Sequence, residues 1–198
     1  MSEKENAKKS KIIIFASGSG TNAENIIKFF QNSKNVEISA VLSNKRSAGA
    51  LRRAHDLNVK ALLFDKESFY HSHDVLNILK DINPDLIILA GFLWLFPSNI
   101  IREFPDKIIN IHPALLPKYG GKGMYGSKVH ETVIAQKEQE SGITIHYVNE
   151  KYDEGQTIFQ ATTPIEENDT PDSLAGKIHE LEYKHFPVVI QQLLEKDN

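Results

Sequence analysis

The chain has 198 residues, of which 40% are apolar and 25% are charged, with a formal net charge of -3 and a pI near 6.2. Such a length and composition are typical of one globular domain, and the mild acidity gives no electrostatic basis for binding nucleic acid or an anionic membrane. Because the sequence contains no Cys, it excludes disulfides, thiolate metal sites and a Cys nucleophile.

The N-terminal segment is polar and rich in Lys and Glu, without the apolar core of a signal peptide. We therefore expect a frayed tail over residues 1–10, one domain over residues 11–198 and a cytoplasmic location. The longest apolar run, Leu86 to Phe96, contains Gly91 and is too short to span a bilayer. No membrane partner is expected.

The first two thirds of the chain alternate between strand-like and helix-like segments. Apolar or β-branched runs predict strands over residues 11–16, 36–42, 59–64, 85–90 and 108–111. Helical spacing of apolar residues predicts helices over residues 21–30, 47–57, 68–82 and 98–104. This alternation implies right-handed βαβ crossovers and a mostly parallel sheet with helices on both faces.

The pattern changes in the last third of the chain. After a helix over residues 127–136, strands over 142–149 and 157–164 follow so closely that an antiparallel hairpin is expected. A long helix then begins after Thr170 as N-cap and runs to about residue 196, with Pro187 expected to kink or interrupt it. The sequence thus predicts an α/β class: a single-domain, Rossmann-like, three-layer fold, mostly parallel, with a C-terminal antiparallel hairpin and a long C-terminal helix.

The most informative motif, Asn110-Ile111-His112-Pro113, lies where an apolar strand gives way to a loop rich in Pro and Gly. Side chains alternate along a strand, so Asn110 and His112 project to one face while Ile109 and Ile111 project to the other. An amide that donates and an imidazole that donates, accepts or changes charge suit a reaction that builds negative charge on a carbonyl oxygen. The alternative is a polar strand end with a turn-forming Asn and a solvated His.

A glycine-containing turn, Ser17 to Ala23, joins the first predicted strand to the first helix. Its glycines let the backbone approach an anion, and the free N–H groups of a helix start point toward it. The turn fits the dinucleotide pattern G-x-G-x-x-G/A, but no acidic residue follows the second strand, where Ser43-Asn44-Lys45 stands instead. This disfavours NAD and leaves a single phosphate group or a plain tight turn.

Asp153 lies in a turn that ends in Gly155, between the two hairpin strands. A turn-forming Asp is the local interpretation. The hairpin nevertheless follows the Asn110 and His112 loop, and α/β sheets bind ligands at the carboxyl ends of their parallel strands. A carboxylate that reaches that crevice could orient His112 or relay a proton.

Three further sets of His residues have structural alternatives. His146 alternates with apolar residues on its strand, which favours a structural histidine over a ligand. His71 and His73 are two residues apart and do not share a helix face, so a solvated helix start is a better interpretation than a metal site. His179 and Glu182 are three residues apart and do share a helix face, where they form either a surface pair or contacts to a substrate.

Together these motifs resemble the folate-dependent formyltransferases, and within them the glycinamide ribonucleotide transformylase family. The similarity runs from Lys11 to Leu194, with several motifs in the same order. Besides the segments already described, it is carried by Leu115-Leu116-Pro117-Lys118-Tyr119, Leu89-Ala90-Gly91-Phe92, residues 142–148 and Asp153-Glu154-Gly155.

The resemblance implies the formyltransferase fold and transfer of a formyl group from 10-formyltetrahydrofolate to the amine of glycinamide ribonucleotide, in purine biosynthesis and without a metal. It places the catalytic groups at Asn110, His112 and Asp153. It places ribonucleotide contacts at Gly20, Thr21, Asn22, His179 and Glu182, and folate contacts at Leu93, Trp94, Leu95, Phe96, Asn110, Asn149, Glu150, Lys151, Tyr152 and Asp153. Both partners are small molecules, and the chain is expected to be a monomer or a homodimer.

The sequence departs from the family pattern in the folate region. Trp94 stands where relatives often have Arg, Gly120-Gly121 replaces a common Pro-Gly, and the Arg that some relatives use near the folate has no counterpart between Lys66 and Ser68.

Several other functions compete with this one. Formyl transfer to methionyl-tRNA would come with a further C-terminal domain and a basic surface, and formyltetrahydrofolate hydrolysis with an added N-terminal domain. Formylation of a sugar-nucleotide amine is another alternative. A non-catalytic nucleotide-binding module would keep the glycine turn but would not need Asn110, His112 and Asp153 together.

Overall fold

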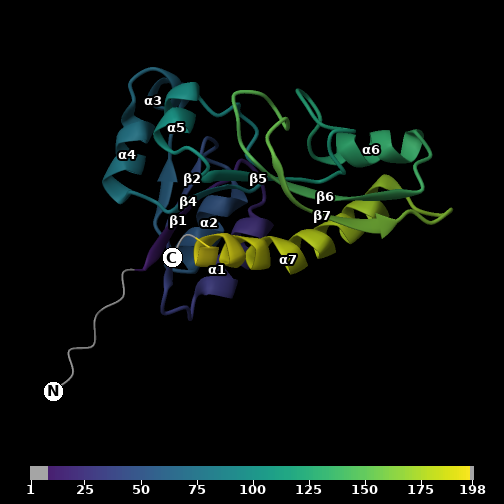
Figure 1. Cartoon of the computed structure of the whole chain (residues 1–198), viewed down its shortest axis with the longest axis horizontal. Coiled ribbons are helices and arrows are strands. Elements are labelled where there is room, and N and C mark those ends of the chain that lie inside the picture. The colour runs from purple at the N-terminus through teal and green to yellow at the C-terminus, as the bar shows by residue number, and fades with distance from the viewer. Residues whose placement is uncertain (1–8, 197–198) are drawn as a thin grey trace.

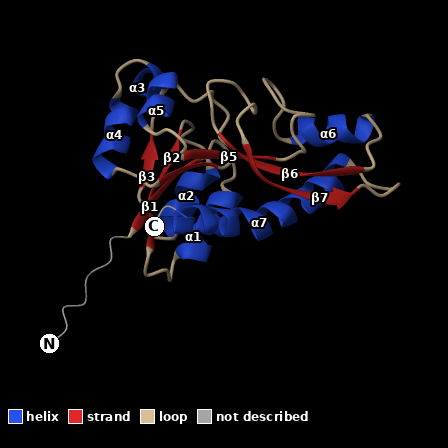
Figure 2. Ribbon diagram, viewed as in Figure 1, coloured by secondary structure: helices blue, strands red, loops and turns tan. Residues whose placement is uncertain are grey.

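A seven-stranded sheet forms the middle layer of the computed structural model, which describes residues 9–196 (Figures 1 and 2). The strand order is β3-β2-β1-β4-β5-β6-β7. The strands are β1 (Ser10–Phe15), β2 (Val36–Ser43), β3 (Ala61–Leu63), β4 (Leu86–Leu89), β5 (Ile108–His112), β6 (Glu140–Tyr147) and β7 (Thr157–Pro164). The tail expected over residues 1–10 lies, through residue 8, outside the described residues.

The first five strands in this order, β3-β2-β1-β4-β5, pair in parallel, whereas β5–β6 and β6–β7 pair antiparallel. The predicted α/β class, with a parallel sheet and a C-terminal hairpin, is confirmed. The helices are α1 (Thr21–Phe30), α2 (Gly49–Asp56), α3 (Lys66–Tyr70), α4 (Asp74–Ile82), α5 (Ser98–Glu103), α6 (Ser127–Ala135) and α7 (Pro171–Lys196).

Helices cover both faces of the sheet, as Figure 2 shows. Helices α1, α2 and α7 contribute to one apolar cluster, to which Ile109 and Ile111 of β5 also belong. Helices α3, α4 and α5 contribute to the other, which includes Phe15 and Ile108. Because Ile109 and Ile111 share one face, Asn110 and His112 share the opposite face, as the strand alternation predicted.

The single helix predicted over residues 68–82 is wrong: α3 ends at Tyr70 and α4 begins at Asp74. Asp65 and Ser68 close a capping box that starts α3 two residues before the predicted start. His73 then takes a left-handed backbone with φ of 62°, which a continuous helix cannot include. His71 and His73 therefore lie at two different helix ends, His71 after α3 and His73 before α4.

Helix α7 continues through Pro187, so the interruption expected there does not occur. Pro187 is buried together with Phe186, Val189 and Ile190. This packing against the sheet holds the helix where local propensity would break it. Its start is as predicted, since the Thr170 hydroxyl accepts from the backbone N–H of Ser173 (3.2 Å).

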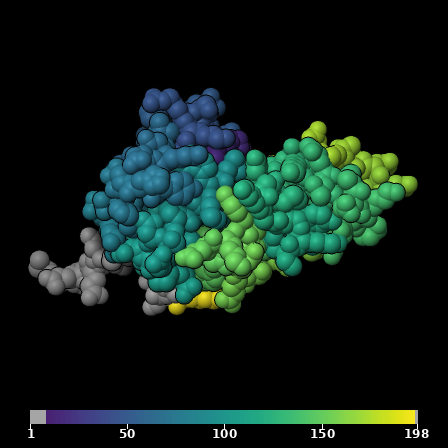
Figure 3. Space-filling view, turned by 90° about the horizontal axis from the view of Figure 1, so that it is seen from above, coloured from purple at the N-terminus to yellow at the C-terminus, as the bar shows by residue number. Residues whose placement is uncertain are grey.

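The strand order reverses between β1 and β4, because the chain leaves β1 toward β2 and returns to β4 on the other side. The carboxyl ends of parallel strands at such a point form the ligand crevice of α/β sheets. Seen from above, the light-green segment near residue 150 lies between the blue N-terminal part and the green part that precedes it in the chain (Figure 3). Among the described helices, none is long and apolar enough to cross a membrane.

Candidate active site

A cleft of about 690 Å³ opens at the carboxyl ends of β1, β4 and β5. The turn between β1 and α1 and the loop from Gly121 to Gly126 both line it. The residues that the sequence singled out and that line it are Gly20, Thr21, Asn22, Leu93, Asn110, His112, Tyr152, Asp153, His179 and Glu182. Segments far apart in the chain thus contribute to one cavity.

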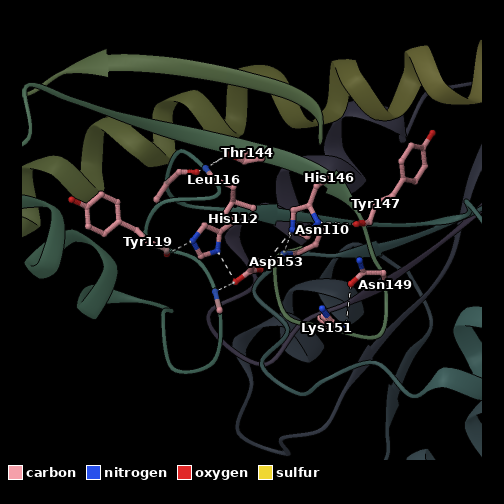
Figure 4. A network of polar contacts seen from close by, with 12 residues as sticks. Asn110, His112, Leu116, Tyr119, Thr144, His146, Tyr147, Asn149, Lys151 and Asp153 are labelled. Carbon is pink, nitrogen blue, oxygen red and sulfur yellow. Dashed lines mark hydrogen bonds and ion pairs between the residues drawn. The ribbon is translucent and has the colours of Figure 1, made fainter. Parts of the chain in front are cut away.

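Both nitrogens of the His112 ring lie beside oxygen atoms (Figure 4). Nε2 is 2.8 Å from the carbonyl oxygen of Tyr119. A carbonyl only accepts, so Nε2 carries a proton and donates it. Nδ1 is 3.5 Å from Asp153 Oδ2, so it forms an ion pair with that carboxylate once Nδ1 takes up a proton. Burial lowers the pKa of His112 below 6.5, although Asp153 and the Tyr119 carbonyl act in the opposite direction.

Asp153 reaches the cleft from the turn between β6 and β7, in a left-handed backbone conformation with φ of 56°. Its Oδ2 accepts a hydrogen bond from the Gly121 N–H at 2.9 Å. Burial alone would raise the pKa of this carboxyl group. The contact with His146, the charge that His112 carries when it is protonated and the Gly121 N–H together outweigh burial and lower the pKa below its ordinary value, so Asp153 is ionised at neutral pH.

His146 belongs to the same network, which sequence patterning did not reveal. Its Nδ1 is 2.8 Å from the carbonyl oxygen of Tyr147, so Nδ1 donates and Nε2 is left as the acceptor. Asn110 Nδ2 donates to that Nε2 at 3.1 Å, and Asp153 Oδ1 lies 3.6 Å from it. The antiparallel register pairs Asn110 directly with His146, and this register was the missing signal.

The amide of Asn110 is therefore oriented by its neighbours. The acceptor Nε2 of His146 requires the NH₂ side of the amide to face it. A second hydrogen of Nδ2 points toward Asp153 Oδ1 at 3.5 Å, the outer limit of a hydrogen bond. Because this contact is long, the second Nδ2 hydrogen can instead be donated to the oxygen atom of a ligand in the cleft.

The turn before α1 presents the helix N-terminus to the other end of the cleft. Gly20 is the N-cap, with φ of 77°, and an added Cβ would lie 2.3 Å from the backbone Cα of Ala50, so only Gly fits. The one acidic residue of the first turn, Glu24, is paired with Lys28 at 2.6 Å and with Arg53. Its charge is thereby compensated, and the helix start keeps its preference for an anion.

Helix α7 supplies a carboxylate to the same end of the cleft. Glu182 is buried, and its Oε2 accepts from Asn22 Nδ2 at 2.8 Å and lies 3.0 Å from His179 Nδ1. The contact with Glu182 is the main reason why the pKa of His179 is raised above 6.5. His179 and Glu182 are therefore more than a surface ion pair, because Glu182 of α7 also accepts a hydrogen bond from Asn22 of α1 in the cleft.

The residues expected to contact folate divide into two groups. Four of them line the cleft: Leu93, Asn110, Tyr152 and Asp153. Of these, Leu93 and Tyr152 offer apolar surface for a flat heteroaromatic ring. Six others do not line it: Trp94, Leu95, Phe96, Asn149, Glu150 and Lys151.

Each of three members of the second group has another environment. Phe96 is buried, with its ring centroid 5.1 Å from that of Phe15. The Trp94 ring lies 5.7 Å from the Lys66 ammonium, and Lys151 pairs with Glu154 at 3.0 Å.

The formyl transferase family matches residues 10–190 of the sequence. The chain belongs to this family. Phosphoribosylglycinamide formyltransferase of Bacillus subtilis is 34% identical over 95% of this chain and 96% of its own length. The chloroplastic phosphoribosylglycinamide formyltransferase of Arabidopsis thaliana is 35% identical over 96% of this chain and 67% of its own length.

Solved formyl transferase structures share the fold. The crystal structure of phosphoribosylglycinamide formyltransferase from Anaplasma phagocytophilum superposes with a TM-score of 0.85 at 30% identity, covering 96% of this chain and 89% of that one. The predicted fold and family are thus confirmed. Within residues 9–196, no group of three or more His, Asp or Glu side chains is arranged to hold a metal ion.

Proposed function

We propose that this formyl transferase moves the formyl group of 10-formyltetrahydrofolate to the amine of glycinamide ribonucleotide, forming formylglycinamide ribonucleotide and tetrahydrofolate. Relatives over nearly the whole chain carry the name phosphoribosylglycinamide formyltransferase. The activity belongs to purine biosynthesis. We further propose a cytoplasmic enzyme that acts, as a monomer or a homodimer, on small molecules alone and without a metal.

One observation carries the proposal: Asn110, His112 and Asp153 meet in the cleft whose other end is the start of α1. Gly20, Thr21 and Asn22 would hold the phosphate of the ribonucleotide with backbone N–H groups. The substrate amine then extends toward Asn110. Leu93 and Tyr152 would hold the pterin-like ring of the formyl donor on the apolar side, which brings the two reactants together in one cavity.

Attack of an amine on a formyl carbon places negative charge on the formyl oxygen. Asn110 would stabilise this oxyanion with the Nδ2 hydrogen that now makes only the 3.5 Å contact to Asp153. His146 keeps the amide in the required orientation, because its Nε2 accepts the other Nδ2 hydrogen. No rotation of Asn110 is needed when the charge develops, which is the advantage of a preorganised donor.

His112 and Asp153 would manage the proton that the amine loses. Nδ1 of His112 is the basic nitrogen, since Nε2 already carries a proton for the Tyr119 carbonyl. A proton arriving at Nδ1 produces an imidazolium between that carbonyl and the Asp153 carboxylate, where it is stabilised and can donate toward the oxyanion or the leaving folate nitrogen. Burial lowers the pKa of His112, so the proton is held briefly and passed on.

The proposal is tested by following folate deformylation by absorbance, with glycinamide ribonucleotide present and absent. A formyl transferase acting on this substrate releases tetrahydrofolate only when the ribonucleotide is present. Release without the ribonucleotide would indicate a hydrolase. Release with a sugar-nucleotide amine in its place would indicate a different acceptor, and no release in either case would indicate a binding module.

A further inference from the structure

His130 of α6 is a buried histidine whose ring makes no hydrogen bond to the described residues. It is 5% exposed, between Val129 and Val133, which pack in the apolar core. Its Nδ1 is fully buried without a hydrogen-bond partner, and among the described residues no partner of Nε2 is found either. An unpaired imidazole in such a position destabilises the fold relative to an apolar side chain. A ligand oxygen that accepts from Nε2 would give the ring a hydrogen-bond partner that the described residues do not supply.

The ring lines the same cleft as Glu182 and His179, and it is close enough to both for their charges to act on it. We name the residues there the polar corner: Asn22, His130, His179 and Glu182, which all line the cleft. A second unpaired atom lies in the same corner, because Asn22 Oδ1 is buried without a partner while its Nδ2 bonds to Glu182. Donors and acceptors without protein partners are thus concentrated where a bound substrate would lie.

The tautomer of His130 follows from burial. Burial is the main reason why the pKa of His130 is lowered below 6.5, so the ring is neutral at pH 7 and has a single N–H. Buried N–H groups without acceptors are rarer than buried lone pairs without donors. The proton therefore belongs on Nε2, and Nε2–H is a donor that a ligand oxygen must satisfy.

The ligand group must accept from this N–H and also suit the carboxylate of Glu182. A hydroxyl does both, because it accepts one hydrogen bond and donates another. The phosphate expected at the start of α1 indicates that this hydroxyl belongs to the ribose. Asn22 belongs both to that helix start and to the polar corner, so the sugar attached to the phosphate falls beside Glu182 and His130.

We propose that His130 binds the substrate by donating a hydrogen bond from Nε2 to a ribose hydroxyl, 2′ or 3′, of the acceptor ribonucleotide, and so favours the ribonucleotide over the counterpart that lacks this hydroxyl. The inference deepens the proposed function and depends on it. It assigns to α6 a recognition role that is separate from the chemistry at Asn110, since His130 contacts the sugar and not the amine or the formyl group.

The test measures binding of glycinamide ribonucleotide, and of its 2′-deoxy and 3′-deoxy counterparts, by titration calorimetry without folate. His130→Leu removes the donor but keeps an apolar side chain of similar bulk. We expect the dissociation constant for the ribonucleotide to rise roughly two- to tenfold, the effect of one hydrogen bond. For the deoxy counterpart that lacks the contacted hydroxyl, the dissociation constant should not change.

Two variants accompany His130→Leu. His130→Gln places an amide donor near the position of Nε2 and should restore part of the affinity. His55→Leu is the matched control, because the His55 side chain is 87% exposed on α2, away from the cleft, and should bind like the parent. The KM for 10-formyltetrahydrofolate should stay constant in all three, with thermal melts to verify the fold.

Parental affinity in His130→Leu would overturn the inference. So would an equal loss for the ribonucleotide and both deoxy counterparts, or a parallel loss of folate binding, because each indicates a structural role. Failure of the proposed function is distinguished by the parental enzyme, which would then bind no glycinamide ribonucleotide and transfer no formyl group to it.

Discussion

Replacing Asp153 by Asn tests the least expected member of the catalytic network. The carboxylate makes four contacts: Oδ2 with the Gly121 N–H (2.9 Å) and His112 Nδ1 (3.5 Å), and Oδ1 with Asn110 Nδ2 (3.5 Å) and His146 Nε2 (3.6 Å). Asn has nearly the same shape, and its oxygen can keep the bond to Gly121. Its NH₂ group then takes the place of Oδ1 and no longer accepts from Asn110 Nδ2. The negative charge and the ability to accept a proton are lost.

The contacts set the size of the expected effects. Since the Gly121 bond survives in neutral form, we expect a loss of about 1 kcal/mol of stability, the difference between a charged and a neutral hydrogen bond. The effect on turnover should be far larger, because an imidazolium at His112 no longer faces a carboxylate. Proton transfer by a positioned group contributes about 10²–10⁴-fold, and kcat should fall by that order. The KM for glycinamide ribonucleotide should change only a few-fold.

The assay follows tetrahydrofolate release by absorbance at saturating ribonucleotide, with calorimetric titration of each substrate and a thermal melt. Asp106→Asn is the matched control. Asp106 is exposed, lies between α5 and β5, and has the same left-handed backbone as Asp153, with φ of 57° against 56°. The same chemical change in the same backbone conformation, away from the cleft, should leave kcat at the parental value.

Parental turnover in Asp153→Asn would refute the assignment and show that Asp153 is only a turn residue. A collapse of folate or ribonucleotide affinity together with kcat would move its role from proton transfer to substrate binding. A drop in kcat of equal size in Asp106→Asn would show that the substitution disturbs the fold through the left-handed backbone.

Three further predictions follow from the site. Asn110→Ala should lower kcat by about 10²–10³-fold, the usual effect of removing one oxyanion donor, measured in the same absorbance assay. Gly20→Ala should lower stability by roughly 1–3 kcal/mol, because the added Cβ meets the backbone of Ala50 at 2.3 Å, and should abolish binding of the ribonucleotide phosphate in calorimetry. Lowering the pH from about 7.5 to about 5.5 should lower the melting temperature of the parent more than that of His112→Gln. The pKa of His112 in the folded protein lies below 6.5, so the unfolded chain binds the proton first as the pH falls. The free energy of unfolding therefore decreases as the pH falls below 6.5.

Each of these predictions has a control or a contrary outcome. Near-parental kcat in folded Asn110→Ala would remove Asn110 from the mechanism. Gly176→Ala is the control for Gly20→Ala, since a Cβ there meets nothing within 4 Å and Ala favours a helix interior, so stability should rise. Equal pH dependence of melting in the parent and in His112→Gln would show that the pKa of His112 is not lowered by folding.

Local patterning predicted the elements that carry their own signals. Helix α1 has the predicted bounds, because its apolar residues recur at helical spacing and a glycine turn precedes it. The break between α3 and α4 escaped prediction, since it depends on the left-handed backbone of His73. The continuation of α7 through Pro187 was also not predicted. Here burial of the helix against distant parts of the chain overrides the local tendency of Pro to break a helix.

The sequence by itself determined the order of strands and helices, the shared face of Asn110 and His112, and the glycine turn before α1. These properties depend on backbone periodicity and on residues that are neighbours in the chain. Only the tertiary structure decided that His146 orients Asn110, that Gly121 and Tyr119 hold Asp153 and His112, and that Glu182 joins α7 to α1. The physical reason is that each of these contacts depends on strand register or on the packing of distant elements, and hydrogen bonds act only over about 3 Å. A sequence pattern can place a side chain on a face, but register and packing decide which group it meets there.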